Sequence, residues 1–155
     1  MAATSTNKQP LLIDRVLHYV IDLNTAAVGA IDVAGTNTAL LLVDGTQQDG
    51  AIIEDIYAIA RGAVESQINL YISPAADYLR PNQGIYVGGF KSATTAGEQT
   101  SWNTMPKILA PMPQTGTEQQ FRAFYLPKGK ALWAARQGNT VITDGPLCGC
   151  QGGWY

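Results

Sequence analysis

The chain has 155 residues and a mass of 16.5 kDa, which is the size of one ordinary domain. Only 14% of the residues are charged and the formal net charge is −2, so we expect no nucleic-acid partner. Apolar residues make up 46% of the chain, enough for one hydrophobic core, while 16 glycines and 8 prolines argue against a helical bundle.

Residues 1–10 are polar and contain no hydrophobic run. They lack the apolar region of a secretory signal, and we expect them to form a flexible N-terminal arm ahead of one domain that spans residues 11–155. No apolar stretch approaches the roughly 20 residues of a membrane-spanning helix. A membrane partner is therefore not expected.

The start of the domain has the alternating pattern of a strand. One face of the pattern is formed by Leu17, Tyr19, Ile21 and Leu23, which alternate with His18, Val20 and Asp22. This predicts a long strand that begins near Leu12. The continuous apolar run 39–43 predicts a second strand, buried on both faces.

Residues 51–60 carry two competing patterns. Isoleucines recur at helical spacing, but the β-branched residues and the glycines at positions 50 and 62 favour a strand. Residues 67–73 alternate strictly and end at Pro74, which cannot donate a hydrogen bond to a neighbouring strand. This is the clearest strand pattern in the chain.

The second half continues the pattern of short apolar segments between turns. Strands are predicted at residues 84–90, 119–126, 130–137 and 140–143, with loops at 92–101 and 106–117. Short strands at this spacing predict an all-β fold, either a single β-sandwich or a small barrel.

Residues for catalysis or metal binding are sparse. His18 is the only histidine and lies on a predicted strand, where a structural role is more common than general-base chemistry. Glu54 and Asp55 are adjacent, so on a strand they point to opposite faces and cannot form an acid–base pair. We therefore expect no enzymatic activity, no cofactor and no metal site.

The two cysteines, Cys148 and Cys150, are separated by one glycine. A disulfide between them would be strained, and two thiols are too few for a structural zinc site. Reduced thiols in a small turn are the favoured interpretation. Cross-linking between neighbouring subunits in an oxidising medium is the alternative.

Several segments are similar to parts of a known class of proteins. They are residues 53–62 (IEDIYAIARG) with 67–72 (QINLYI), residues 124–132 (FYLPKGKAL), the C-terminal GGWY, and residues 4–15 (TSTNKQPLLIDR). Together they resemble small β-sandwich structural proteins of tailed bacteriophages, of the capsid cement or decoration type. The cysteine pair and the proline-rich loop near residue 110 have no counterpart in that pattern.

This resemblance implies a virion structural protein that binds the outside of a phage capsid and stabilises the shell. The implied partners are the major capsid protein and further copies of this chain, with a homotrimer favoured. The implied location is the capsid surface, after assembly in the host cytoplasm. The polar arm and the aromatic C-terminus are the candidate partner-binding residues, namely Thr4, Asn7, Lys8, Gln9, Trp154 and Tyr155.

Two other functions share the same features. A carbohydrate-binding or receptor-binding module would use a β-sandwich with aromatic side chains, and the chain has three tryptophans and seven tyrosines. A head–tail joining or minor tail protein would share the virion location. Because each is a site on a common fold, the sequence leaves both open.

Overall fold

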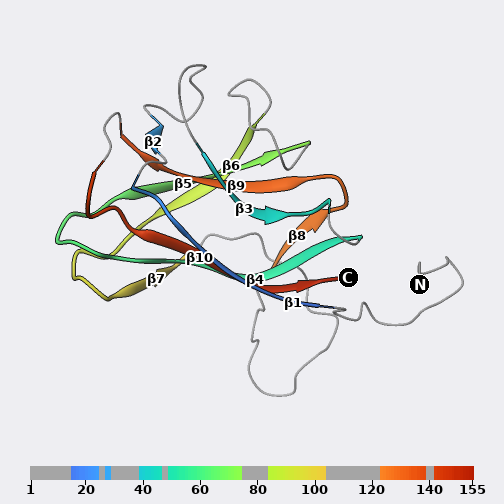
Figure 1. Cartoon of the computed structure of the whole chain (residues 1–155), viewed down its shortest axis with the longest axis horizontal. Coiled ribbons are helices and arrows are strands. Elements are labelled where there is room, and N and C mark those ends of the chain that lie inside the picture. The colour runs from blue at the N-terminus through green and yellow to red at the C-terminus, as the bar shows by residue number, and fades with distance from the viewer. Residues whose placement is uncertain are drawn as a thin grey trace, which may run out of the picture.

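The fold consists of two β-sheets packed face to face (Figure 1). The computed structural model describes residues 15–24, 27–28, 39–46, 49–74, 84–103, 123–138 and 142–155. Sheet A contains β1 (Arg15–Asp22), β4 (Gly50–Ile59), β7 (Gln99–Ser101), β8 (Phe124–Pro127) and β10 (Leu147–Trp154). Sheet B contains β2 (Ala27–Val28), β3 (Leu40–Asp44), β5 (Gln67–Ser73), β6 (Ile85–Lys91) and β9 (Ala131–Gln137).

The strand order differs from the order along the chain in both sheets. Sheet A runs β1–β10–β4–β7, and β8 also pairs with β4; sheet B runs β2–β9–β5–β6, and β3 also pairs with β9. The described pairs are antiparallel except for the short parallel pair of β2 and β9. The last strand therefore lies between the first strand and β4.

The predicted all-β fold and its sandwich form are confirmed, and the two sheets do not close into a barrel. Residues 51–59 belong to β4, as the β-branched composition indicated, with Ala60 just beyond its end, and 67–73 coincide with β5. Residues 1–10, for which an arm was predicted, lie outside the described residues.

Several local predictions are corrected, and one concerns the predicted loop 92–101, whose last three residues form β7. Ile142 and Thr143 lie outside the strands, although 140–143 were predicted as one, and residues 140–141 are outside the described part. Of the predicted 119–126 strand, residues 124–126 lie in β8 and Ala123 lies before it, while residues 119–122 are outside the described part. Tyr19 is exposed, whereas Leu17 and Ile21 are buried. All three alternate along β1, but β1 is the edge of sheet A, where a long ring can project past the sandwich.

An extra residue in β4 changes which of its side chains face the core. Gln151 pairs with Asp55, and the next residue, Gly152, pairs with Ile53, so Glu54 has no partner in β10. Such a β-bulge shifts the alternation of side chains by one residue. As a result Ile53 and Ile56, three positions apart, are both fully buried.

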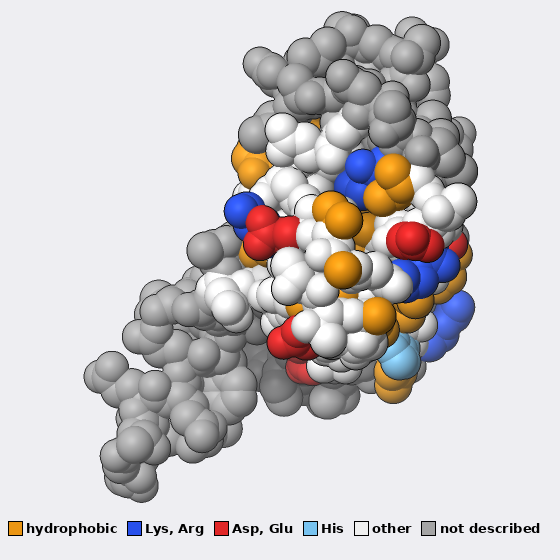
Figure 2. All heavy atoms as spheres, turned by 90° about the vertical axis from the view of Figure 1, so that its left-hand side faces the viewer, with side chains coloured by type: hydrophobic (Ala, Val, Ile, Leu, Met, Phe, Trp, Pro, Cys, Tyr) orange, Lys and Arg blue, Asp and Glu red, His pale blue; other side chains and the backbone are white. Residues whose placement is uncertain are grey.

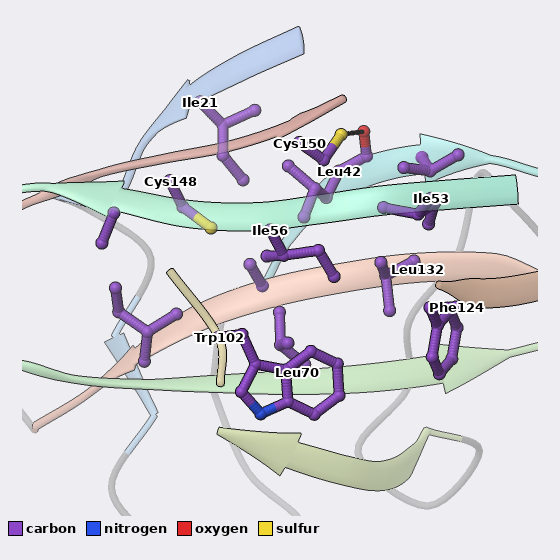
Figure 3. Packing of buried hydrophobic residues seen from close by; sticks show 14 of the residues in the cluster. Ile21, Leu42, Ile53, Ile56, Leu70, Trp102, Phe124, Leu132, Cys148 and Cys150 are labelled. Carbon is purple, nitrogen blue, oxygen red and sulfur yellow. Dashed lines mark hydrogen bonds between the residues drawn. The ribbon is translucent and has the colours of Figure 1, made fainter. Parts of the chain in front are cut away.

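The core lies between the two sheets (Figure 3). Ile53 and Ile56 from sheet A meet Leu70 and Leu132 from sheet B, and burying each such side chain contributes roughly 1.5–3 kcal/mol. Trp102, directly after β7, packs on Phe124 with their ring centroids 6.2 Å apart. These contacts join segments that are distant in the sequence.

Both cysteines lie inside this core rather than in the predicted turn. They occupy alternate positions of β10, so both side chains point toward sheet B, and both are free thiols with no exposed surface. The Cys150 thiol lies 3.9 Å from the Leu42 carbonyl oxygen. Burial raises the pKa of Cys150 to about 12 and raises that of Cys148 further. Folded subunits thus offer no accessible thiol here for a cross-link.

The other face of sheet B also contains buried aromatic side chains. Trp133 is buried, and its indole nitrogen donates a hydrogen bond to the Ser73 hydroxyl at 2.8 Å. Tyr71 packs beside it and meets Tyr86 edge to face. β5 is therefore buried on both faces, although its sequence predicts a strand with one polar face.

Candidate functional site

The side of sheet A that is turned away from sheet B, here called the outer face, carries the candidate site. Cross-strand pairing places its side chains in rows. One row runs Val16, Gly153, Ile52 and Tyr125; the next runs His18, Gln151 and Asp55; the third runs Val20, Gly149, Tyr57 and Ser101. The outer face thus combines residues from β1, β10, β4, β7 and β8.

The ends of the outer face are apolar and exposed. Val16 is 78% exposed, Tyr125 47% and Val20 40%. Figure 2 shows hydrophobic side chains around the histidine on one side of the molecule. Single exposed apolar residues are ordinary, but a group of them on one sheet face is typical of an interaction surface.

The centre of the outer face is polar, and two hydrogen-bonded pairs lie in it. The Nε2 atom of His18 and the Tyr57 hydroxyl are 3.0 Å apart, and the Ser101 hydroxyl donates to Asp55 at 3.2 Å. Burial raises the pKa of Tyr57, which keeps its hydroxyl protonated. The predicted structural role of His18 therefore agrees with this hydrogen bond.

This arrangement does not assemble a reactive centre. His18 and Asp55 lie on β1 and β4, with Gln151 of β10 between them, so the imidazole and the carboxylate are not adjacent. Within the described ranges no group of three histidine, cysteine, aspartate or glutamate side chains could hold a metal ion. Within the described ranges, the outer face thus combines exposed apolar side chains with paired polar groups, and its imidazole and carboxylate are not in contact.

The C-terminal aromatic residues are tied into the chain itself. The Trp154 indole nitrogen donates to the Asp44 carbonyl oxygen at 3.3 Å, and the Arg15 guanidinium lies 5.4 Å from the centre of the Trp154 ring. Tyr155 stacks on Tyr125 with ring centroids 5.4 Å apart.

The backbone of Tyr155 is held as well. It accepts a hydrogen bond from Asp49 at 2.8 Å and donates one to Gly50 at 3.3 Å. Trp154 and Tyr155 are both half-buried. Both side chains are therefore only partly accessible to a partner. Tyr155 lies next to Tyr125 of the outer face.

The sequence-based candidates and the outer face overlap only at this C-terminus. Thr4, Asn7, Lys8 and Gln9 lie outside the described residues. Val16, Val20 and Tyr125 were not predicted as site residues. One signal was present for the valines, because β1 is apolar at successive positions, which leaves apolar side chains on both of its faces.

Comparison with protein-family models, with curated proteins and with solved structures finds no match to this chain. In the described part of the chain, no helix is both long and apolar enough to span a membrane.

Proposed function

We propose that the protein is a structural component of a phage virion that binds the outside of the capsid as a cement or decoration protein. The observation that carries this proposal is the outer face of sheet A, where Val16, Val20 and Tyr125 are exposed while the polar groups between them bond to one another. Such a surface gains free energy by covering apolar area and needs no reactive group. Its occupant in this proposal is the major capsid protein.

The remaining support comes from the sequence. The segments that resemble capsid decoration proteins include strands of both sheets and the residues that lead into β1. A sandwich with a dense core is a stiff unit, which suits a protein that reinforces a shell. Residues 1–10 would add contacts along the capsid, and several copies would act together as a homo-oligomer.

The test is co-sedimentation of the purified protein with expanded capsids that lack it. We expect the wild-type protein to bind and Val16→Glu to lose at least tenfold in affinity, because a carboxylate would then be buried in the contact. Val64→Glu is the matched control, since Val64 is 76% exposed but lies in the turn after β4, away from the outer face. Equal binding by both variants would overturn this assignment of the surface.

A carbohydrate-binding or receptor-binding function is the second candidate, and one observation favours it. Tyr125 presents a half-exposed ring, supported by its stack on Tyr155, on the same sheet face as the planar polar groups of Gln151 and Asp55 in the next row. Aromatic rings beside planar polar groups form sugar-binding platforms. Binding to a glycan array that is lost in Tyr125→Ala, without binding to capsids, would support this candidate instead.

The number of copies per virion tests the remaining alternative. Six or twelve copies, rather than hundreds, would indicate a neck or tail protein.

A further inference from the structure

In the described part of the chain, strand β1 lies at the edge of sheet A. It is eight residues long and pairs with β10 along its whole length without a shift in register. Within the described ranges no strand pairs with its other side. The outward-pointing backbone N–H and C=O groups of such an edge are a template for another strand.

The other strands at the margins of the sheets carry features that discourage such pairing. β7 has three residues, and β8 has four and ends at Pro127, followed by Lys128. β6 contains two glycines, ends at Lys91 and has an irregular register with β5. β3 is short and irregular in its pairing with β9. Short strands, lysine, proline and bulges are the usual protection of sheet edges, and β1 has none of them.

We propose that β1 pairs antiparallel with β1 of a second copy, around a twofold axis that passes beside His18. The two copies of sheet A then form one continuous sheet, and each strand supplies the other with backbone hydrogen bonds. This pairing does not depend on whether the protein binds a capsid.

The side chains of β1 select this register. An axis beside His18 places Val16 opposite Val20 of the second copy, so the two valines lie side by side on the outer face. On the inner side it places Tyr19, which is 53% exposed, opposite Leu17 of the second copy. Moving the axis to Tyr19 would instead put Val16 opposite the carboxylate of Asp22.

The charges of β1 select the antiparallel direction. Its only positive side chain is at the first residue, Arg15, and its only negative one is at the last, Asp22. In this antiparallel register Arg15 of each copy lies opposite Ile21 of the other, whereas parallel pairing in register would place Arg15 opposite Arg15 and Asp22 opposite Asp22. Asp22 also holds Arg61 at 2.7 Å, so this end of the strand is fixed in the free subunit.

The test is cysteine cross-linking in the full-length chain. In this register residue 18 lies opposite its own copy, so we expect His18→Cys to form a disulfide-linked dimer under mild oxidation, which reductant reverses. Val64→Cys, which is also exposed but lies in the turn after β4 and outside the proposed pairing, should give no disulfide-linked dimer, and the buried Cys148 and Cys150 should not contribute. A dimer formed by Tyr19→Cys but not by His18→Cys would overturn the register.

Light scattering of the unmodified protein tests the assembly itself. We expect a dimer that dissociates on dilution, and Tyr19→Lys should weaken it at least tenfold, because lysine protects a sheet edge. Val64→Lys should leave it unchanged. A monomer at all concentrations would overturn the proposal, as would the homotrimer that the sequence resemblance implies, because a twofold pair cannot close into a trimer.

Discussion

The ring of Tyr57 lies over Gly149, in the space that a side chain at residue 149 would occupy. From there its hydroxyl reaches His18 across β10, at 3.0 Å. The contact ties three neighbouring strands of sheet A together on the outer face. It also explains why β10, the strand that carries both cysteines, has a glycine between them.

We expect Gly149→Ala to lower the free energy of unfolding by about 1–3 kcal/mol, because the new methyl group would overlap the Tyr57 ring. Urea unfolding followed by tryptophan fluorescence measures the loss. Adding Tyr57→Ala to Gly149→Ala removes the overlap, so the double variant should lose less than the sum of the two single variants. Simple additivity would show that the ring and the methyl group do not collide.

Gly152→Ala should be more damaging than Gly149→Ala. A side chain at residue 152 would collide with the carbonyl oxygen of Ile52, which belongs to the backbone of β4 and cannot rotate away as a tyrosine ring can. This is also the position where the register of β10 and β4 shifts. We expect a loss of more than about 3 kcal/mol, or failure to fold, in the same urea experiment. A loss smaller than that of Gly149→Ala would contradict this ranking.

These glycines also explain why the sequence predicts some parts of the fold and not β10. The sequence predicts strands such as β5 because their apolar residues alternate, and this alternation is a local property of the sequence. In β10, by contrast, glycines stand where Tyr57 and the Ile52 backbone approach, and a glycine-rich sequence is typical of turns. The need for glycine arises from contacts with β4, nearly a hundred positions earlier in the sequence.

The outer face was predictable only in part, for the same reason. The apolar residues on both faces of β1 can be read from its sequence. The pairing of Asp55 with Ser101 joins residues 46 positions apart, and Tyr125 reaches the outer face through the pairing of β8 with β4. No local pattern encodes such neighbours, because they follow from the strand order of the sheet.

The two thiols should react only when the protein unfolds. We expect a thiol reagent at pH 8 to label neither Cys148 nor Cys150 in the native protein and to label both in denaturant, because burial excludes the reagent and disfavours the thiolate. Rapid labelling of native protein would show that the strand opens easily.

Replacement of both cysteines by alanine should lower the free energy of unfolding less than replacement by serine, because the serine hydroxyls would need hydrogen-bond partners inside the core.

The same thiols should make the protein sensitive to alkali. Their pKa values are raised on folding from the reference value of 9.0, to about 12 for Cys150, so their neutral form is favoured in the native state. The contribution is complete below about pH 9 and is lost as the pH rises toward the folded pKa, at up to about 1.4 kcal/mol per pH unit for each thiol. Urea unfolding between pH 8 and 11 measures this slope. The double alanine variant should show a shallower one, and an unchanged slope would assign the effect to other groups.

Deleting Trp154 and Tyr155 should destabilise the fold, because both are held by contacts within the chain. The deletion removes the indole hydrogen bond to Asp44, the stack on Tyr125 and the two backbone hydrogen bonds of Tyr155. We expect a loss of about 3–5 kcal/mol, comparable to truncating a packed tryptophan, measured by thermal and urea unfolding. A variant that keeps its stability but loses capsid binding would show instead that these residues serve the partner.

Deleting residues 1–9, in contrast, should leave the stability of the fold almost unchanged. This segment contains no run of apolar residues that could join the core, so the free energy of unfolding should change by less than about 1 kcal/mol. Under the proposed function its polar side chains, including Thr4, Asn7, Lys8 and Gln9, lie along the capsid, and their removal should weaken capsid binding at least tenfold. The Trp154–Tyr155 deletion is the matched comparison, because it removes candidate binding residues from the other end of the chain. If the shortened protein unfolds instead, residues 1–9 contribute to the sheets, and their proposed role in docking fails.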